Sequence, residues 1–219
     1  MEYRCVATSV EGFVQQLAVA YVTHGYWFYV VGEIPEGKDP AAVDRKLVER
    51  YGIAISKWAR ARRKRQGLAN MQYLRYERTF VLVATKGRHE FFEREAGQIR
   101  DIRRMPIKFV RYSIGCAWGV DGRYHASVRI HRDEYLKLKS YFLDLARHRS
   151  AERIAAELHR LPFTPFARVR RQFKQILRAV NRDRKEVGVE AVPVTVLRLR
   201  RRIVRPFHHA AGEAEREAA

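Results

Sequence analysis

Residues 107–130 read IKFVRYSIGCAWGVDGRYHASVRI and predict a β-hairpin. Aromatic and β-branched residues, which are typical of strands, fill both halves of this stretch. Between the halves stands Asp121–Gly122, a pair that adopts two positive φ angles at little cost. The sequence therefore predicts strands over 107–118 and 123–130, joined by a tight turn of the primed type.

A turn at Asp121 and Gly122 also fixes which residues face one another across the hairpin. It pairs Trp118 with His125, Cys116 with Ser127, Ile114 with Arg129 and Tyr112 with His131. One face of the hairpin would then combine aromatic rings, imidazoles and a guanidinium, with which sheets stack unpaired bases. The candidate binding residues on this face are Tyr112, Trp118, His125 and Arg129. In the alternative interpretation, a neighbouring helix simply covers the two aromatic rings.

Upstream of the hairpin, helical and strand-like patterns alternate. Phe13, Leu17 and Tyr21 recur at helical spacing between the capping residue Ser9 and the helix stop Gly25. The same kinds of pattern predict a strand over 26–33, a helix that starts at Asp39–Pro40, a strand region over 70–84, and a helix over 89–100 with Phe92, Ala96 and Ile99 inward. This order predicts an α+β fold, a mixed or antiparallel sheet with its flanking helices on one face. It does not choose between a ferredoxin-like arrangement and other four- or five-stranded sheets.

Downstream of the hairpin, the pattern becomes helical. A first helix carries Tyr135, Leu138, Phe142 and Leu145, Ser150 caps a second, and a third runs from about 166 to 185 and ends at Gly188. Residues 192–207 have an extended, basic pattern, and residues 208–219 are small and polar, which is typical of disorder. We therefore expect an α+β sheet domain over 1–132, a basic helical nucleic-acid-binding region over 133–207 and a disordered tail.

The third of these helices has two chemically distinct faces. At about 100° per residue, its apolar positions lie opposite its polar row. The apolar positions are Phe166, Val169, Phe173, Ile176, Leu177 and Val180. The polar row consists of Arg168, Arg171, Gln175, Arg178, Arg182 and Lys185. Because a solvated helix face normally mixes charges of both signs, a row without an acid predicts contact with a phosphate backbone or a groove. The short helix, the proline-bearing turn and the long basic helix are also similar to a helix-turn-helix, in which residues 192–205 would form a wing.

Two further stretches concentrate cations. Residues 60–65 read RARRKR, a run too charged to pack against a core, and phosphate binding is therefore expected of Arg60, Arg62, Arg63, Lys64 and Arg65. A nuclear-localisation sequence is the alternative interpretation of this run. Residues 197–205 read LRLRRRIVR, whose alternation places Leu197, Leu199 and Ile203 on one face and Arg198, Arg200 and Arg202 on the other. A basic ribbon of that kind follows a groove or a single strand.

The whole chain is strongly basic, with 44 Lys and Arg against 24 Asp and Glu, a net charge of +20 and a pI near 10.5. Seventeen basic and five acidic residues lie between Arg147 and Arg205, so less than a third of the chain carries more than half of the net charge. A polyanion relieves such self-repulsion and releases its own counterions on binding. DNA or RNA is therefore the expected partner. The plain alternative is a basic surface without a specific partner.

Membrane insertion and export are not expected. No run approaches the roughly 20 apolar residues that span a bilayer, and the first twelve residues lack a basic leader followed by an apolar core. Only Cys5 and Cys116 are present, which excludes a disulfide framework and fits a reducing compartment. The sequence favours an intracellular, cytoplasmic protein, nucleoid-associated if its partner is DNA. It does not fix an oligomeric state.

No pattern in the sequence establishes an enzymatic activity. Two cysteines do not make a zinc site, His208–His209 lies in the expected tail, and no glycine-rich phosphate loop is present, so neither a metal nor a cofactor is expected. His125 and His131 share a predicted strand face, but their spacing does not match that of nicking enzymes. A nuclease or strand-transfer enzyme of a mobile genetic element is one alternative to simple backbone binding. An RNA-scaffold component of a ribonucleoprotein is the other.

Overall fold

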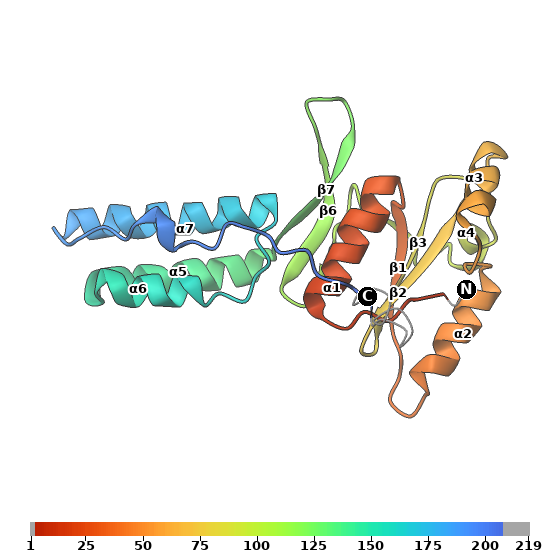
Figure 1. The fold of residues 1–219 in the computed structure, drawn as a ribbon, viewed down its shortest axis with the longest axis horizontal. Helices are drawn as coiled ribbons and strands as arrows, with labels where there is room; N and C mark the ends of the chain where they lie inside the picture. The colour runs from red at the N-terminus through yellow and green to blue at the C-terminus, as the bar shows by residue number, and fades with distance from the viewer. Residues whose placement is uncertain (1–2, 208–219) are drawn as a thin grey trace, which may run out of the picture. The chain divides into compact units, whose positions relative to one another are not determined.

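The computed structural model describes residues 3–207, which form two compact units (Figure 1). The helical unit consists of Lys108–Ile114 and Ser127–Ile203, and the remaining described residues form the sheet unit. Each unit is discontinuous in sequence because both strands of the hairpin over 107–130 pass from one unit to the other. The two units therefore do not meet at a single boundary such as residue 132. The tail over 208–219 lies outside the described residues.

A continuous helical segment opens the sheet unit. α1 (Val10–Gln15) continues as a π-helix (Gln16–Tyr21) and ends in a 3-10 turn (Val22–His24). Ser9 Oγ accepts a hydrogen bond from the Gly12 N–H at 3.0 Å, and Gly25 ends the segment with a φ of 90°. The helix predicted from this cap and this stop is confirmed.

The sheet of this unit contains four antiparallel strands in the order β2-β3-β1-β4. They are β1 (Phe28–Glu33), β2 (Met71–Tyr76), β3 (Thr79–Ala84) and β4 (Arg100–Asp101). The helices that connect them are α2 (Pro40–Arg50) and α3 (Lys57–Arg65) between β1 and β2, and α4 (Phe91–Arg94) between β3 and β4. The predicted α+β class is confirmed, and strand–helix–strand–strand–helix–strand is the ferredoxin-like connectivity.

Two of the predicted elements are wrong in detail. The strand region over 70–84 is a hairpin of β2 and β3, because the chain reverses at Glu77, whose φ is 51°. The helix expected over 89–100 contains only the single turn Phe91–Arg94, and Ala96 is exposed instead of inward. A single turn buries few side chains, and Phe91 is the one that enters the core completely.

Both faces of the four-stranded sheet are covered. On one face, Val30, Leu82 and Tyr73 lie side by side across three strands and share a core with Tyr51 and Phe91 from the helical connections. Residues of the opposite face, such as Val81 and Val83, are equally buried. α1 and α2 lie on opposite sides of the strands (Figure 1). The expectation of helices on one face is therefore wrong for α1.

One buried charge pair fastens α2 to the sheet. Asp44 Oδ1 accepts a hydrogen bond from the Tyr73 hydroxyl at 2.6 Å. The Arg75 guanidinium donates to the same carboxylate from Nε, at 2.8 Å to Oδ1, and from Nη2, at 2.8 Å to Oδ2. Asp44 and Arg75 are each less than a tenth exposed. This paired and hydrogen-bonded geometry is the one in which charged groups are tolerated away from water.

The hairpin over 107–130 is present, but its first strand is interrupted. β5 (Ile107–Phe109) and β6 (Tyr112–Trp118) replace the single strand expected over 107–118, because Val110 adopts a φ of 50°. β7 (Tyr124–Ile130) completes a three-stranded sheet in the order β5-β6-β7.

The turn of this hairpin is longer than predicted. The Gly119 N–H donates to the Arg123 carbonyl at 2.8 Å, and the Gly122 N–H donates to the Gly119 carbonyl at 3.2 Å. Gly122 has a φ of 70°, whereas Asp121 is not among the described residues with a positive φ. The loop is therefore the three-residue kind, a turn followed by a left-handed glycine, and the primed turn is wrong.

A three-residue loop shifts the pairing of the strands by one residue. Gly119 pairs with Arg123 near the loop, and at the other end the His131 N–H donates to the Arg111 carbonyl at 2.8 Å. Trp118 consequently faces Tyr124 rather than His125, and Tyr112 faces Ile130 rather than His131. A shift of one residue moves side chains to the other face. His125 and Arg129 therefore lie on the opposite face from Trp118 and Tyr112, and the predicted composite face is wrong.

The helical unit contains the three expected helices, α5 (Arg132–His148), α6 (Ala151–His159) and α7 (Ala167–Glu186). Ser150 caps α6 by accepting from the Arg153 N–H at 3.3 Å, and Gly188 follows α7 with a φ of 72°. α5 and α7 lie side by side along their lengths (Figure 1). Among the described residues of 192–207, a 3-10 turn (Val194–Val196) is the regular element, and no strand forms a wing. The helix-turn-helix prediction is therefore not confirmed.

Arg184 is the buried cation of the helical unit. It is 3% exposed, and its Nη1 donates to the carbonyls of Ala146, at 2.9 Å, and Arg149, at 2.8 Å. Its Nε donates to the Glu190 carbonyl. A guanidinium at the carbonyl end of α5 satisfies acceptors that the helix leaves free and complements the helix dipole.

Candidate nucleic-acid interface

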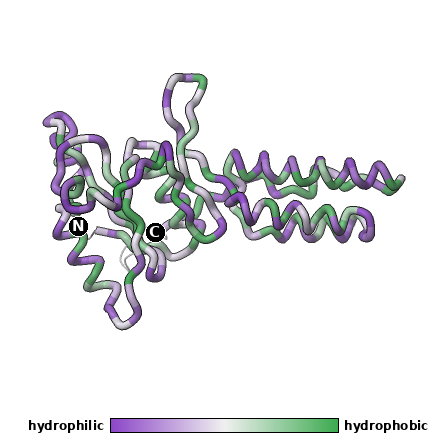
Figure 2. The backbone as a smooth tube through the Cα atoms, turned by 180° about the vertical axis from the view of Figure 1, so that it is seen from behind, coloured by the Kyte–Doolittle hydropathy of each residue, from purple (hydrophilic) through white to green (hydrophobic). Residues whose placement is uncertain are grey.

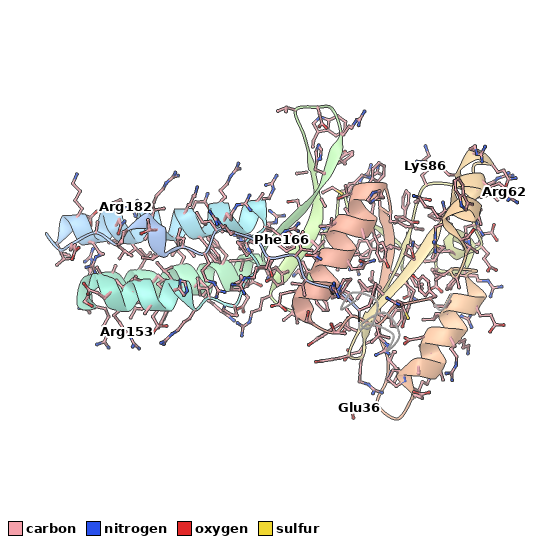
Figure 3. The ribbon with its side chains drawn as sticks, viewed as in Figure 1. Glu36, Arg62, Lys86, Arg153, Phe166 and Arg182 are labelled. Atoms are coloured by element: carbon pink, nitrogen blue, oxygen red, sulfur yellow. The ribbon has the colours of Figure 1, made fainter. Side chains whose placement is uncertain are left out.

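α7 presents an exposed cationic face opposite a buried apolar stripe. The exposed residues include the whole predicted row, Arg168, Arg171, Gln175, Arg178, Arg182 and Lys185. The buried residues are the predicted apolar positions, Phe166, Val169, Phe173, Ile176, Leu177 and Val180. Hydrophilic and hydrophobic positions alternate along α7 in Figure 2, and Arg182 points away from the helix in Figure 3. The predicted phase of this helix is confirmed.

Sequence reasoning missed Lys174, which extends the exposed row, and Arg170, which is half-buried beside it. Lys174 is exposed and lies in the same angular sector as Arg171 and Arg178. We call Arg168, Arg171, Lys174, Gln175, Arg178, Arg182 and Lys185 the α7 basic face. The spacing of Lys174 from Arg171 and Arg178, three and four residues, is the sequence signal that places it on this face.

Two open hollows border the α7 basic face. One has a volume of about 340 Å³ and is lined by Ala167, Arg170, Arg171, Lys174, Gln175 and Arg178. The other, of about 400 Å³, is lined by Lys174, Leu177, Arg178, Asn181 and Val194. Neighbouring groups hold two of the polar side chains in place, because Arg170 Nη1 donates to the Pro165 carbonyl at 2.8 Å and Tyr135 donates to Gln175 Oε1 at 3.3 Å. Lys174 and Arg178 line both hollows.

Among the described residues, carboxylates reach only the C-terminal end of the α7 basic face. Arg182 Nε lies 3.6 Å from Asp183 Oδ1. Oε2 of the nearby Glu186 lies 3.6 Å from Nη2 of Arg147 in α5. Within residues 3–207, no carboxylate forms an ion pair with any other cation of the face. These cations keep their hydrogen-bond donors available, and guanidinium groups use such donors to bind phosphate in pairs.

The arginine-rich run over 60–65 forms most of α3. Ser56 caps this helix, and the cations near its end complement the helix dipole. Arg62, Lys64 and Arg65 are exposed, and Figure 3 shows Arg62 pointing outward. Arg60 and Arg63 are half-buried instead, which the sequence analysis did not expect.

Arg60 has a structural contact in the sheet unit. Its Nη2 donates to the Ile53 carbonyl at 2.8 Å, and its own carbonyl accepts from the Asn70 amide at 3.0 Å. The expectation that no member of the run packs against the protein is therefore wrong for Arg60 and Arg63. The aliphatic part of an arginine side chain covers apolar surface readily, and charge alone does not reveal this.

The arginines over 198–202 lie on an irregular segment rather than a strand. Arg198, Arg200 and Arg202 are exposed and Leu197 is buried, as the alternation predicted, but Ile203 is 83% exposed. Arg198 Nη1 donates to the His159 carbonyl at 3.4 Å. The guanidinium of Arg201 lies 5.0 Å from the ring centre of Phe166, the residue that precedes α7. The segment therefore adds exposed cations to the helical unit, whereas the run of α3 belongs to the sheet unit.

The candidate residues of the hairpin have different surroundings. Tyr112 is buried, its hydroxyl accepts from the Thr164 N–H at 2.8 Å, and its ring lies edge-on to Phe163. It is therefore a core residue, as the alternative interpretation held. Trp118 is 65% exposed, against that interpretation. Arg129 is exposed on the other face of β7.

His125 and Asp121 form an exposed pair at the hairpin turn. His125 Nε2 lies 2.8 Å from Asp121 Oδ1, and this hydrogen bond lowers the pKa of the aspartate. His131, the other histidine of the predicted pair, lies beside Asp133 at the start of α5. Across residues 3–207, no three His, Cys, Asp or Glu side chains are grouped as a metal site. No described helix is both long enough and apolar enough to cross a membrane.

No protein-family model, curated protein or solved structure matches this chain. We therefore infer its function from the residues and their geometry alone. The α7 basic face is the feature on which sequence pattern, exposure and charge agree.

Proposed function

We propose that this protein binds nucleic acid and that the α7 basic face contacts the phosphate backbone. The observation that carries the proposal is the exposure of six cations along one side of a single helix whose other side is fully buried. A helix held in this way presents its donors without a large ordering cost on binding. The proposal includes an intracellular, cytoplasmic location. If the partner is DNA, the protein would be associated with the nucleoid.

The dimensions of the α7 basic face suit a backbone. At 1.5 Å per residue, Arg168 and Lys185 are separated by about 26 Å along the helix axis. Double-stranded DNA carries one negative charge per about 1.7 Å of its axis, so the face meets several phosphates at once. Each neutralised phosphate releases condensed counterions, which favours binding entropically. A phosphate row is common to DNA and RNA, and the proposal covers both.

Removal of charge from the face tests the proposal. Fluorescence polarisation with dye-labelled DNA and RNA should show weaker binding by Arg171→Ala/Arg178→Ala, with a loss of about 1.5–3 kcal/mol for each charged hydrogen bond broken. The matched control is Lys137→Ala/Arg153→Ala, which removes the same charge from exposed positions of α5 and α6. Equal affinities of the two double variants would show that only net charge matters and would contradict the proposal.

The same mixtures test the alternative activities. Mg²⁺ should be added to bound DNA and RNA, because a nuclease would then yield shorter strands. A strict preference for folded RNA without cleavage would favour the RNA-scaffold form of the proposal.

A further inference from the structure

The tip of the β6–β7 hairpin carries an ordered set of aromatic rings, all within the sheet unit. The ring centroids of Trp118 and Tyr124 lie 4.8 Å apart with an interplanar angle of 75°. Those of Tyr124 and Trp27 lie 5.8 Å apart at 66°. Edge-to-face contacts of this kind are favourable beyond the area they bury. We call Trp27, Tyr124 and Trp118 the aromatic ladder.

The inner end of the aromatic ladder is fixed by polar contacts. The Trp27 indole N–H donates to the Val22 carbonyl at 3.3 Å. The Arg103 guanidinium lies 4.4 Å from the Trp27 ring centre and 5.5 Å from that of Tyr124. Asp101 holds this guanidinium, with Nε 2.9 Å from Oδ1 and Nη2 2.6 Å from Oδ2. The inner rings are therefore locked before any ligand arrives.

The outer end of the ladder is open. Trp118 is 65% exposed although its indole is held edge-on against Tyr124. A Cβ at Gly119 would lie 2.6 Å from the His125 ring and 2.5 Å from Asp121 Oδ1, so a larger residue would displace these two side chains. The register set by the three-residue loop places Trp118 beside Tyr124. An exposed indole in a fixed position offers a flat surface that binds a second ring with little loss of side-chain entropy.

We propose that Trp118 stacks on an unpaired base of a bound nucleic-acid strand, so that the aromatic ladder recognises single-stranded segments. This inference rests on the proposed function and adds the kind of nucleic acid that the sheet unit prefers. Every base has a π-face, so stacking of this kind tolerates any sequence. Bases in a duplex are already stacked on one another and do not offer that face to the protein.

The charges around the ladder favour a nucleotide as its occupant. Arg103 lies over the Trp27 and Tyr124 rings, so a cation accompanies the aromatic ladder as cations do in single-strand grooves. A lipid surface is the other partner that an exposed tryptophan fits. Insertion of the tip would dehydrate Asp121, whose carboxylate His125 stabilises in its charged form. The turn is therefore poorly suited to a membrane.

Three dye-labelled probes of equal length test the proposal by fluorescence polarisation: a mixed-sequence single strand, the same strand in a duplex, and a strand of abasic sites. Trp118→Ala should weaken binding of the single strand by about 5- to 150-fold, the equivalent of about 1–3 kcal/mol per stacked base. Its affinity for the duplex and the abasic strand should stay unchanged. Trp118→Phe, which keeps a ring, should recover most of the affinity.

Val120→Ala is the matched control, because Val120 is fully exposed on the same turn and has no ring. It should bind the single strand as the parent does. An unchanged single-strand affinity of Trp118→Ala would overturn the inference, and so would an equal loss on all three probes. Binding to vesicles of anionic phospholipid that depends on Trp118, without an effect on the single strand, would also overturn it.

The proposed function and this inference fail separately. Loss of binding in Arg171→Ala/Arg178→Ala, with none in Trp118→Ala, refutes only the stacking role. A parent protein that binds none of the three probes refutes both. Circular dichroism of each variant should show the parent spectrum, since Trp118 is largely exposed and surface substitutions change stability little.

Discussion

At the scale of single residues, the Asp44–Arg75 pair is the contact whose loss should matter most for the sheet unit. Removal of one partner leaves the other charge buried and unpaired. Asp44→Ala should therefore lower the free energy of unfolding by about 3–5 kcal/mol, measured by urea denaturation. The control is Glu49→Ala, an exposed carboxylate on the same helix, which should change it by no more than about 0.5 kcal/mol. Equal stabilities of the two variants would contradict the structural role of the pair.

The Asp101–Arg103 pair should make stability depend on pH. The hydrogen bonds from Arg103 hold the pKa of Asp101 below its ordinary value of 3.8. A carboxyl with a lowered pKa in the folded state stabilises the protein above its unfolded pKa, and this contribution is lost as the pH falls through the folded pKa. The difference in unfolding free energy between the parent and Asp101→Asn should therefore be constant above about pH 5 and shrink below about pH 4. Urea denaturation at several pH values measures it, and a difference that does not vary with pH would disprove the assignment.

At the scale of elements, local chemistry in the sequence was sufficient to predict most helices. Ser9 and Ser150 accept the cap hydrogen bonds expected of them, and the faces of α7 follow from residue spacing alone. Long-range pairing was not predictable in the same way. β4 contains only two residues and is defined by its pairing with Phe28 and Tyr29 of β1, which no local pattern indicates. Asp121–Gly122 fits a two-residue turn and a three-residue loop equally well, so the sequence did not fix the length of the loop. The additional loop residue shifts the strand pairing by one and changes which side chains share each face of the hairpin.

The buried side of α7 should fail differently from its exposed side. Phe173 is 3% exposed, and its ring centroid lies 6.3 Å from that of Phe163. Phe173→Ala should cost about 3–5 kcal/mol of stability, since it removes a buried ring and leaves a cavity. Arg171→Ala on the same helix should leave the melting temperature nearly unchanged. Thermal melts of both variants, followed by circular dichroism, make the comparison. An unstable Arg171→Ala would mean that the arginine belongs to a buried network.

The arginine-rich run in α3 should contain residues that bind nucleic acid and residues that stabilise the fold. Arg62, Lys64 and Arg65 are exposed, so their replacement by Gln should weaken nucleic-acid binding in a polarisation assay without a change in stability. Arg60→Gln should instead lower stability by about 0.5–1.5 kcal/mol, because the hydrogen bond to the Ile53 carbonyl is lost. A triple variant that binds as the parent does would show that α3 is not part of the interface.

At the scale of the whole molecule, the net charge of +20 affects both the stability of the free protein and its affinity for a polyanion. Like charges repel in the free protein, and a bound polyanion removes that repulsion. Arg184 and Arg75 are buried and paired with carbonyl or carboxylate oxygens, so they do not contact a bound polyanion. The α7 basic face, the exposed members of α3 and the segment with Arg198, Arg200 and Arg202 carry charge that a polyanion can reach.

The salt dependence of binding should report how many of these cations meet phosphates. If the six cations of the α7 basic face each neutralise one phosphate, the slope of log affinity against log salt concentration should be about −5 on a duplex and about −4 on a single strand. Arg171→Ala/Arg178→Ala should reduce the steepness by about 2 on a duplex, because two counterion releases are lost, whereas Lys137→Ala/Arg153→Ala should not change it. Titrations of salt in polarisation assays with both probes provide the slopes. Since stacking on Trp118 releases no counterion, Trp118→Ala should shift the single-strand line downward and leave its slope unchanged. A parent slope shallower than about −2 would show that the α7 basic face does not lie against the backbone.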